Sequence, residues 1–307
     1  MKASSFAYHR PADRAAAIEM LASLSAARLI AGGQSLVAML NMRYAFVENL
    51  IDINRVAGLA GIDVRGGTAR IGAMTRQRTM LEDVELAARA PIIGEALRFV
   101  GHLHTRNRGT IGGSLAHMDP AAELMNVATL LDATVHVESA RRVRDVSIAD
   151  YPVSFMTPQL EPDEMIAAVT LRLPTPGHGW SFYEFAQRHG DFAIVAVGVT
   201  VSLTAGRVAE ARAVLSGIDF TPRRLGEVER MLNGETPSDA LIADAAELAG
   251  KEEAISDAMA SGAYRQHLAK VLTRRALTQA LARAKREPCN DDADLDRSDG
   301  QRQILQT

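Results

Sequence analysis

Cysteine is nearly absent from this 307-residue sequence, which contains a single one, Cys289. A disulfide needs two cysteines, and an iron–sulfur cluster is usually held by about four of them. The chain therefore holds neither by itself, nor a zinc site made of thiolates. Any redox chemistry in which it takes part must use an organic cofactor or the metals of a partner chain.

The sequence also lacks an excess of charge of one sign and any long apolar run. Its net charge of -3 gives no basic surface for nucleic acid or for an acidic membrane. No stretch approaches the roughly 20 apolar residues of a membrane span, and the first residues, MKASSFAYHRPADR, lack the apolar core of a signal peptide. We therefore expect a cytoplasmic protein. Its 47% hydrophobic and 23% charged residues are typical of a globular protein.

Hydrophobic periodicity predicts a mixture of helices and strands. Pro11 suits the first turn of a helix, and the alternating residues around Gly66-Gly67 suit a β-hairpin. The predicted helices cover residues 11–24, 35–43, 91–101, 121–133, 221–232, 237–249 and 262–286. The predicted strands cover residues 27–33, 48–54, the 61–75 hairpin, 134–139, 141–148, 164–174 and a pair within 192–217. Because strands and helices do not alternate steadily, the pattern favours an α+β fold over a doubly wound sheet.

The composition changes at two places along the chain. The proline- and glycine-rich stretch PTPGHG, residues 174–179, is the best candidate for a domain boundary. Near residue 287 the sequence becomes polar and uneven, so we expect residues 287–307 to form a disordered tail.

Two glycine pairs lie in similar surroundings far apart in the sequence. Gly32-Gly33 lies in AGGQSL and Gly112-Gly113 in TIGGS, and an apolar, helix-like segment follows each pair. Glycine adopts backbone angles that other residues avoid and has no side chain to keep a ligand away, so such a turn can point several N–H groups at one anion. A helix that begins there adds free N–H groups and its positive dipole end. Ser35, Thr110 and Ser114 add hydroxyl donors.

Two such turns suit the two phosphates of a pyrophosphate, held from both sides. Spacing alone leaves a simpler interpretation open at about equal weight, because a glycine pair often makes only a tight turn. Neither turn has the G-x-G-x-x-G or G-x-x-x-x-G-K-[ST] pattern, so neither a dinucleotide fold nor a P-loop is indicated. We expect both turns to be surface features rather than parts of a core.

Three motifs together resemble a known family. They are AGGQSL (31–36), RNRGTIGGSLAHMDPAAEL (106–124) and RHGDFAIVAVGV (188–199). In order and spacing they are similar to the FAD-binding medium subunit of molybdenum hydroxylases, of the aerobic carbon monoxide dehydrogenase and xanthine dehydrogenase type. The similarity runs over about residues 1–286.

The resemblance implies two domains. The first is a two-lobed FAD-binding domain of the PCMH, vanillyl-alcohol-oxidase-like kind at residues 1–176, with lobes at about residues 1–57 and 58–176. The second is a C-terminal α+β domain of the carbon monoxide dehydrogenase flavoprotein type at residues 177–286.

The resemblance also implies which residues hold FAD. The turn residues that would wrap the pyrophosphate are Ala31, Gly32, Gly33, Gln34, Ser35, Leu36, Thr110, Ile111, Gly112, Gly113 and Ser114. Glu123 stands where the family usually carries an aspartate that bonds the FAD ribose, although a first-turn glutamate also favours the helix dipole. Ile166 falls where the family packs an aliphatic residue on the adenine, although it suits an ordinary strand core nearly as well.

Two further residues are expected near the flavin ring. Asp191 lies in the motif that brings the C-terminal domain toward the isoalloxazine, or it only caps a turn. Tyr183 would cover one face of that ring, or belong to a core. His102 and His104 lack supporting carboxylates or cysteines, so we expect no metal site. With no G-x-S-x-G and no H-E-x-x-H pattern, we expect no catalytic residue, and the flavin carries the chemistry.

The function that the resemblance implies is electron transfer. FAD would receive electrons from the [2Fe–2S] clusters of a small partner subunit and pass them to an external acceptor. A large partner subunit would carry the molybdenum–pterin cofactor, in a heterotrimer or a dimer of heterotrimers. The alternatives are a stand-alone FAD-dependent oxidoreductase on the same fold and a scaffold that has lost its flavin.

Overall fold

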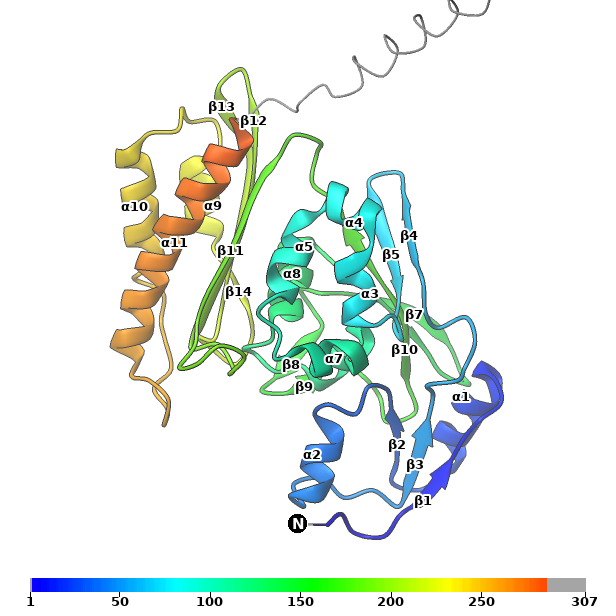
Figure 1. Cartoon of the computed structure of the whole chain (residues 1–307). Helices are drawn as coiled ribbons and strands as arrows, with labels where there is room; N and C mark the ends of the chain where they lie inside the picture. The colour runs from blue at the N-terminus through cyan, green and yellow to red at the C-terminus, as the bar shows by residue number, and fades with distance from the viewer. Residues whose placement is uncertain (1, 286–307) are drawn as a thin grey trace, which may run out of the picture.

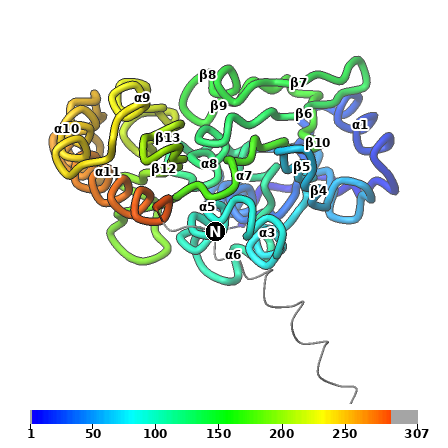
Figure 2. Tube along the Cα trace, turned by 90° about the horizontal axis from the view of Figure 1, so that it is seen from above, coloured from blue at the N-terminus to red at the C-terminus, as the bar shows by residue number. Residues whose placement is uncertain are grey.

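The computed structural model describes residues 2–285, so the predicted tail and Cys289 lie outside the described residues. The chain forms three units, each built on its own β-sheet. Figure 1 shows the N-terminal unit below the central unit and the C-terminal unit beside the central one. Seen from above in Figure 2, the C-terminal helices lie at one end of the molecule and α1 at the opposite end. The mixture of sheets and helices confirms the α+β fold class.

The N-terminal unit has a three-stranded parallel sheet in the order β1-β3-β2. Its elements are β1 (Ala7–His9), α1 (Arg14–Ser23), β2 (Ala27–Ile30), α2 (Leu36–Asn41) and β3 (Asn49–Asp52). The predicted helix at 11–24 begins only at Arg14, because the Asp13 carboxylate caps it by accepting a 2.9 Å hydrogen bond from the Ala16 N–H. The core of this unit also includes Leu59, Met74 and Met165 from the central unit.

The central unit has a five-stranded antiparallel sheet in the order β4-β5-β10-β6-β7. Its strands are β4 (Ile62–Arg65), β5 (Thr68–Gly72), β6 (Thr134–Glu138), β7 (Val143–Ser147) and β10 (Met165–Arg172), with a small hairpin of β8 (Pro152–Ser154) and β9 (Thr157–Pro158). Its helices are α3 (Gln77–Glu82), α4 (Val84–Arg89), α5 (Pro91–Leu97), α6 (Leu103–Arg108), α7 (Ile111–His117) and α8 (Glu123–Leu130). The hairpin predicted around Gly66-Gly67 is confirmed, since both glycines have the positive φ that its turn requires.

The C-terminal unit has a four-stranded antiparallel sheet in the order β11-β12-β13-β14. Its elements are β11 (Gly179–Phe185), β12 (Val195–Thr204), β13 (Arg207–Ser216), β14 (Arg223–Arg224), α9 (Gly226–Leu232), α10 (Asp239–Ala249) and α11 (Gly262–Ala284). Helices α9 and α11 pack on one face of this sheet and α10 packs on these two helices, whereas α5 and α8 pack on the other face of the sheet (Figure 1). The predicted strand pair and the last two helices are confirmed, whereas the helix expected from residue 221 starts at Gly226, after β14.

Side-chain contacts fix the joint between the central and C-terminal units. Phe99 and Phe182 pack with their ring centroids 5.7 Å apart. The Asn126 side chain of α8 donates a 2.9 Å hydrogen bond to the Ser216 hydroxyl, and the Arg212 guanidinium donates to the Leu130 carbonyl at 3.3 Å. The joint is therefore held by aromatic packing and by buried hydrogen bonds.

Candidate functional site

The first glycine turn lies between β2 and α2. Gly33 has a φ of 74°, in the left-handed region that glycine occupies without strain. Ser35 caps α2 without a side-chain hydrogen bond. Within residues 2–285, the backbone N–H groups of residues 32–35 donate no hydrogen bond. This turn therefore presents a row of free donors, as the sequence predicts.

The second glycine turn is built differently. Thr110 caps α7, and its hydroxyl oxygen accepts a 3.0 Å hydrogen bond from the Gly113 N–H. The N–H groups of Ile111, Gly112 and Ser114 donate to the carbonyls of Thr75, Ala73 and Thr110. The expectation of two equivalent, donor-rich turns is therefore wrong, because two donors of the second turn bond to the segment after β5 and two bond to Thr110 within the turn.

The second turn is also not the surface feature that we expected. Thr110, Ile111 and Gly112 are all buried. A Cβ on Gly112 would lie 2.5 Å from the Ala73 Cβ and 2.8 Å from the Ala73 carbonyl oxygen. Glycine is required here because the backbone of α7 packs directly against the segment that follows β5.

The structure brings the two turns together. A Cβ on Gly32 would lie 2.8 Å from the carbonyl carbon of Arg108 and 3.0 Å from the Gly109 Cα. A Cβ on Gly113 would lie 3.7 Å from the Ala31 Cβ. Two segments far apart in the sequence thus face each other where the N-terminal unit meets the central unit.

A chain of hydrogen bonds connects the two turns, and sequence reasoning missed it. The Asn54 side-chain amide donates to the Ala31 carbonyl at 2.8 Å and to the Asp52 carboxylate at 2.6 Å. The Arg76 guanidinium donates to the Asn54 amide oxygen at 2.6 Å and also to the Arg108 carbonyl. The sequence signal for it is the polar pair in IDIN, where Asp52 ends the strand β3 and Asn54 lies two residues further on.

Glu123 is the first residue of α8 and lies in the joint region near Arg106 and Asp119. Burial raises the pKa of its carboxyl group to about 7; the charge of Asp119 adds to this rise, whereas a backbone hydrogen bond and the charge of Arg106 oppose it. A carboxyl group with this pKa titrates near neutral pH.

The remaining predicted residues lie in different surroundings. Ile166 is a 5% exposed residue of the central core, opposite Val137 in the sheet. Asp191 is exposed in the loop after β11; the neighbouring Gly190 has a φ of 87°, and a Cβ there would lie 2.9 Å from the His102 ring. The Asp191 loop therefore reaches the segment that leads into the second turn. Tyr183 is not brought to the turns, because it packs against the C-terminal core.

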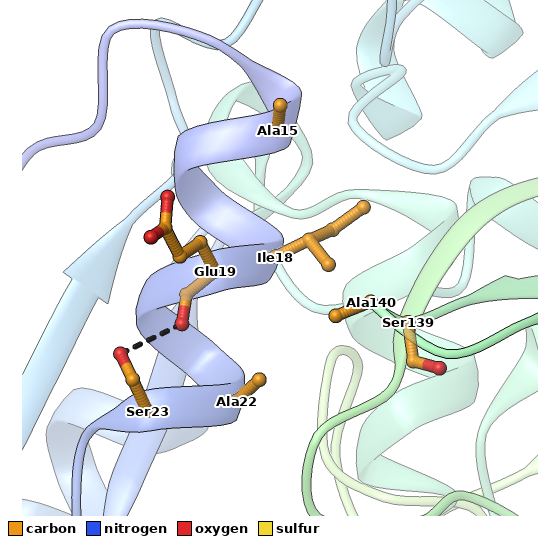
Figure 3. Close-up of a pocket in the computed structure, with 7 residues that line it drawn as sticks. All are labelled: Ala15, Ile18, Glu19, Ala22, Ser23, Ser139 and Ala140. Carbon is orange, nitrogen blue, oxygen red and sulfur yellow. Dashed lines mark hydrogen bonds between the residues drawn. The ribbon is translucent and has the colours of Figure 1, made fainter.

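The hollow drawn in Figure 3 is separate from this site. It has a volume of about 450 Å³ and lies between α1 and the β6–β7 turn, and the residues that line it are Ala15, Ile18, Glu19, Ala22, Ser23, Ser139 and Ala140. Its wall is mostly apolar, and the hydrogen bond drawn there joins the Ser23 hydroxyl to the Glu19 carbonyl within the helix. None of the predicted cofactor-binding residues lines it.

Residues 2–285 contain no group of three or more His, Cys, Asp or Glu side chains that could hold a metal ion. No helix among the same residues is both long enough and apolar enough to cross a membrane.

Two facing glycine turns lie where two units meet, and the free N–H donors of one of them are the kind of feature found in a domain that takes an anionic nucleotide cofactor. Comparison with known families identifies it. Residues 4–176 match the family model described as the FAD binding domain in molybdopterin dehydrogenase, and residues 180–280 match the CO dehydrogenase flavoprotein C-terminal domain. The chain belongs to this family of FAD-binding proteins, which confirms the resemblance.

Known proteins resemble the chain over nearly its whole length. The 6-hydroxypseudooxynicotine dehydrogenase complex subunit alpha of Paenarthrobacter nicotinovorans is 39% identical over 84% of this chain and 88% of its own. The nicotine 6-hydroxylase medium subunit of the same organism is 34% identical over 92% of this chain and 100% of its own. Among solved structures, a chain of quinoline 2-oxidoreductase from Pseudomonas putida 86 superposes with a TM-score of 0.89 at 35% identity, covering 92% of this chain and 99% of that chain.

The first turn fits FAD on its own geometry. Its free N–H groups suit a pyrophosphate held by neutral donors, and the left-handed Gly33 gives the backbone the required bend. The Ser114 hydroxyl, on the facing turn, makes no hydrogen bond within the described residues. The cofactor prediction, FAD, agrees with the family.

Proposed function

We propose that this chain is the FAD-carrying electron-transfer subunit of a heteromeric molybdenum-containing dehydrogenase, and thus part of an oxidoreductase. The observation that carries the proposal is the match to both family domains along one chain, residues 4–176 and 180–280. Electrons come from [2Fe–2S] clusters in a small partner subunit and leave to an external acceptor. A large partner subunit holds the molybdenum–pterin cofactor, in a heterotrimer or a dimer of heterotrimers. The single cysteine supports this division of labour, because the chain has no ligand set for a cluster.

In this proposal the chain binds and orients the cofactor. Bound FAD supplies the redox chemistry, since a flavin exchanges electrons both singly and in pairs. The N–H groups of residues 32–35 hold the pyrophosphate, and the second turn, residues 110–114, gives that site a rigid wall with the Ser114 hydroxyl as donor. Glu123 binds the ribose, and Ile166 packs on the adenine.

The C-terminal unit completes the site in the same proposal. Asp191 comes toward the isoalloxazine on a loop that contacts the segment before the second turn, which supports its assignment. The position of Tyr183 in the C-terminal core gives no support for a contact with the ring. We keep the domain division at residues 176 and 177, the lobe division at residues 57 and 58, and a cytoplasmic location as parts of the proposal.

The test is anaerobic reduction of the flavin with and without partners. The isolated subunit should release noncovalent FAD on denaturation, in a ratio of about one to one, and should not be bleached by organic substrates. Adding the small and large subunits should allow one member of a panel of N-heterocycles, aldehydes, purines and carbon monoxide to bleach it. Direct bleaching of the isolated subunit by such a substrate would instead establish the stand-alone oxidoreductase. A colourless protein that takes up no FAD would establish the scaffold.

A further inference from the structure

Glu184 is a partly buried acid that no motif of the sequence assigns to the cofactor site. It lies on β11, two residues after Phe182, which packs against Phe99 of the central unit. Side chains alternate along a strand, so Glu184 points toward the central unit whereas Tyr183 points into the C-terminal core. The Glu184 Oε2 atom is buried and has no hydrogen-bond partner within the described residues.

The sheet register brings Glu184 near the start of α8. Glu184 pairs with Ala196 on β12, and Ala196 pairs with Ser216 on β13, so the three residues form one row across the sheet. Asn126 of α8 donates to the Ser216 hydroxyl at 2.9 Å, which places the helix over this row. Glu123 lies one helical turn before Asn126 on the same side of α8. The joint therefore brings together two carboxyl groups, one from each domain.

The surroundings of this pair disfavour two negative charges. Burial is the main cause that raises the pKa of Glu184 to about 8, and the charge of Glu123 adds to it. Burial likewise raises the pKa of Glu123 to about 7. When two acids interact in this way, the first proton leaves the pair more easily than the second. One proton therefore stays on the pair near neutral pH.

Few other charged groups face the pair. Asp119, before α8, and Arg106, on α6, oppose each other in their effect on Glu123. On α5, which packs on β11, the Glu95 carboxylate is paired with Arg283 at 2.7 Å. On β12 the residue beside Glu184 is Ala196, which does not titrate. On the opposite face of β11, the Ser181 hydroxyl donates to Gln279 of α11, and both of these groups are neutral.

We propose that Glu123 and Glu184 share one proton and act as a donor–acceptor pair of the FAD site, in which Glu184 is a neutral carboxylic acid. The pair then offers one O–H donor and one carboxylate acceptor, a combination that suits the hydroxyl groups of FAD. Loss of the shared proton removes the donor and adds a second negative charge to a site that binds a pyrophosphate. FAD binding therefore weakens as the proton leaves. This inference rests on the proposed function, because it places Glu184 beside Glu123 in the same cofactor site.

The experiment measures the Kd for FAD of the full-length chain between pH 6 and 9, by quenching of FAD fluorescence. For release of one proton, linkage allows at most a tenfold change per pH unit, so we expect the Kd to rise about tenfold between pH 7.5 and 9. Glu184→Gln keeps a neutral donor, so its Kd at pH 7 should stay within about threefold of the wild type and should not rise with pH. Glu184→Leu should bind weakly at every pH. Glu85→Gln, which changes an exposed acid on α4, is the matched control and should retain the wild-type pH dependence.

A wild-type Kd that is constant over this range, or a Glu184→Gln variant that keeps the full pH dependence, would overturn the inference. If the Glu184 variants do not fold, infrared spectroscopy of the wild-type protein tests the inference instead. A protonated-carboxyl band at pH 7 that is lost by pH 9 supports it, and the absence of such a band at pH 7 overturns it. Failure of the proposed function gives a different result, because then the wild-type chain does not bind FAD at any pH or is bleached directly by a substrate.

Discussion

Replacing Gly32 by alanine tests the closest approach between the two glycine turns. Its new Cβ would lie 2.8 Å from the Arg108 carbonyl carbon, whereas ordinary van der Waals contacts begin at 3.4 Å. The obstacle is backbone, so the two turns must separate by more than half an ångström. The same Arg108 carbonyl accepts from Arg76, so this movement also disturbs the chain of hydrogen bonds through Asn54.

The expected cost follows from overpacking, which usually destabilises by about 1–3 kcal/mol. For a domain of this size each kcal/mol lowers the Tm by roughly 2–4 °C, so we expect a decrease of about 2–12 °C. The FAD content of the purified protein should fall as well, because the free donors of residues 32–35 move away from the second turn. Thermal unfolding with and without added FAD, together with the flavin absorbance, measures both effects.

Gly226→Ala is the matched control for this change. Gly226 begins α9, and a Cβ there would have no neighbour within 4 Å. Alanine in a helix loses less conformational entropy on folding, so the control should be neutral or stabilise by up to about 1 kcal/mol. If Gly32→Ala bound FAD as the wild type does and unfolded at the same temperature as this control, the described approach of the two turns would be incorrect.

Three other substitutions test the hydrogen-bond chain and the two acids Glu164 and Glu184. Asn54→Ala should lower the free energy of unfolding by about 1–3 kcal/mol in urea and weaken FAD binding, because the Ala31 carbonyl and the Arg76 guanidinium lose their partner. Glu164 accepts hydrogen bonds from Arg144, which lowers its pKa to about 2, so Glu164→Gln should cost about 1.5–3 kcal/mol at pH 7 and progressively less as the pH falls from about 4.5 to 2. The pH dependence of stability has the opposite sign for Glu184, because its pKa is raised to about 8. The wild-type chain should lose stability as the pH rises from about 4.5 to 8. The Tm of Glu184→Gln relative to wild type should therefore increase over that range. Equal pH profiles of wild type and variant would contradict either acid assignment.

Elements with a strong local signal were predicted from the sequence. Helices α10 and α11 are capped by Ser238 and Ser261, whose hydroxyls accept a hydrogen bond from the N–H group three residues further on. Their apolar residues recur at helical spacing. The Gly66-Gly67 hairpin was predictable because the glycine pair itself indicates the turn. Helix α7 was missed because its IGGSLAH segment contains two glycines, which disfavour a helix. Its stability comes from the Thr110 cap and from packing of Gly112 on Ala73, and local sequence does not report these contacts.

The two glycine turns were identified from sequence, but their difference was not. A glycine pair in the sequence indicates where backbone N–H groups can be exposed. It does not indicate which carbonyl acceptors lie near those N–H groups once the sheet has formed. The N–H groups of the second turn find the Ala73 and Thr75 carbonyls only after β5 is in place. Glu184 was missed for a similar reason, since its proximity to Glu123 depends on the register of three strands and on the position of α8.

The difference between the turns has a consequence for how the site is held in shape. The first turn has the free donors, and it lies in the N-terminal unit. The largest core of this unit is completed by Leu59, Met74 and Met165 of the central unit. The second turn is held by hydrogen bonds to the segment that follows β5. The orientation of the free donors must therefore come from the connection between the units, and the hydrogen bonds of Asn54 and Arg76 supply it. In the proposed function, the affinity for FAD then depends on Asn54 and Arg76, although the hydrogen bonds of these two side chains are made within the protein and not to the cofactor.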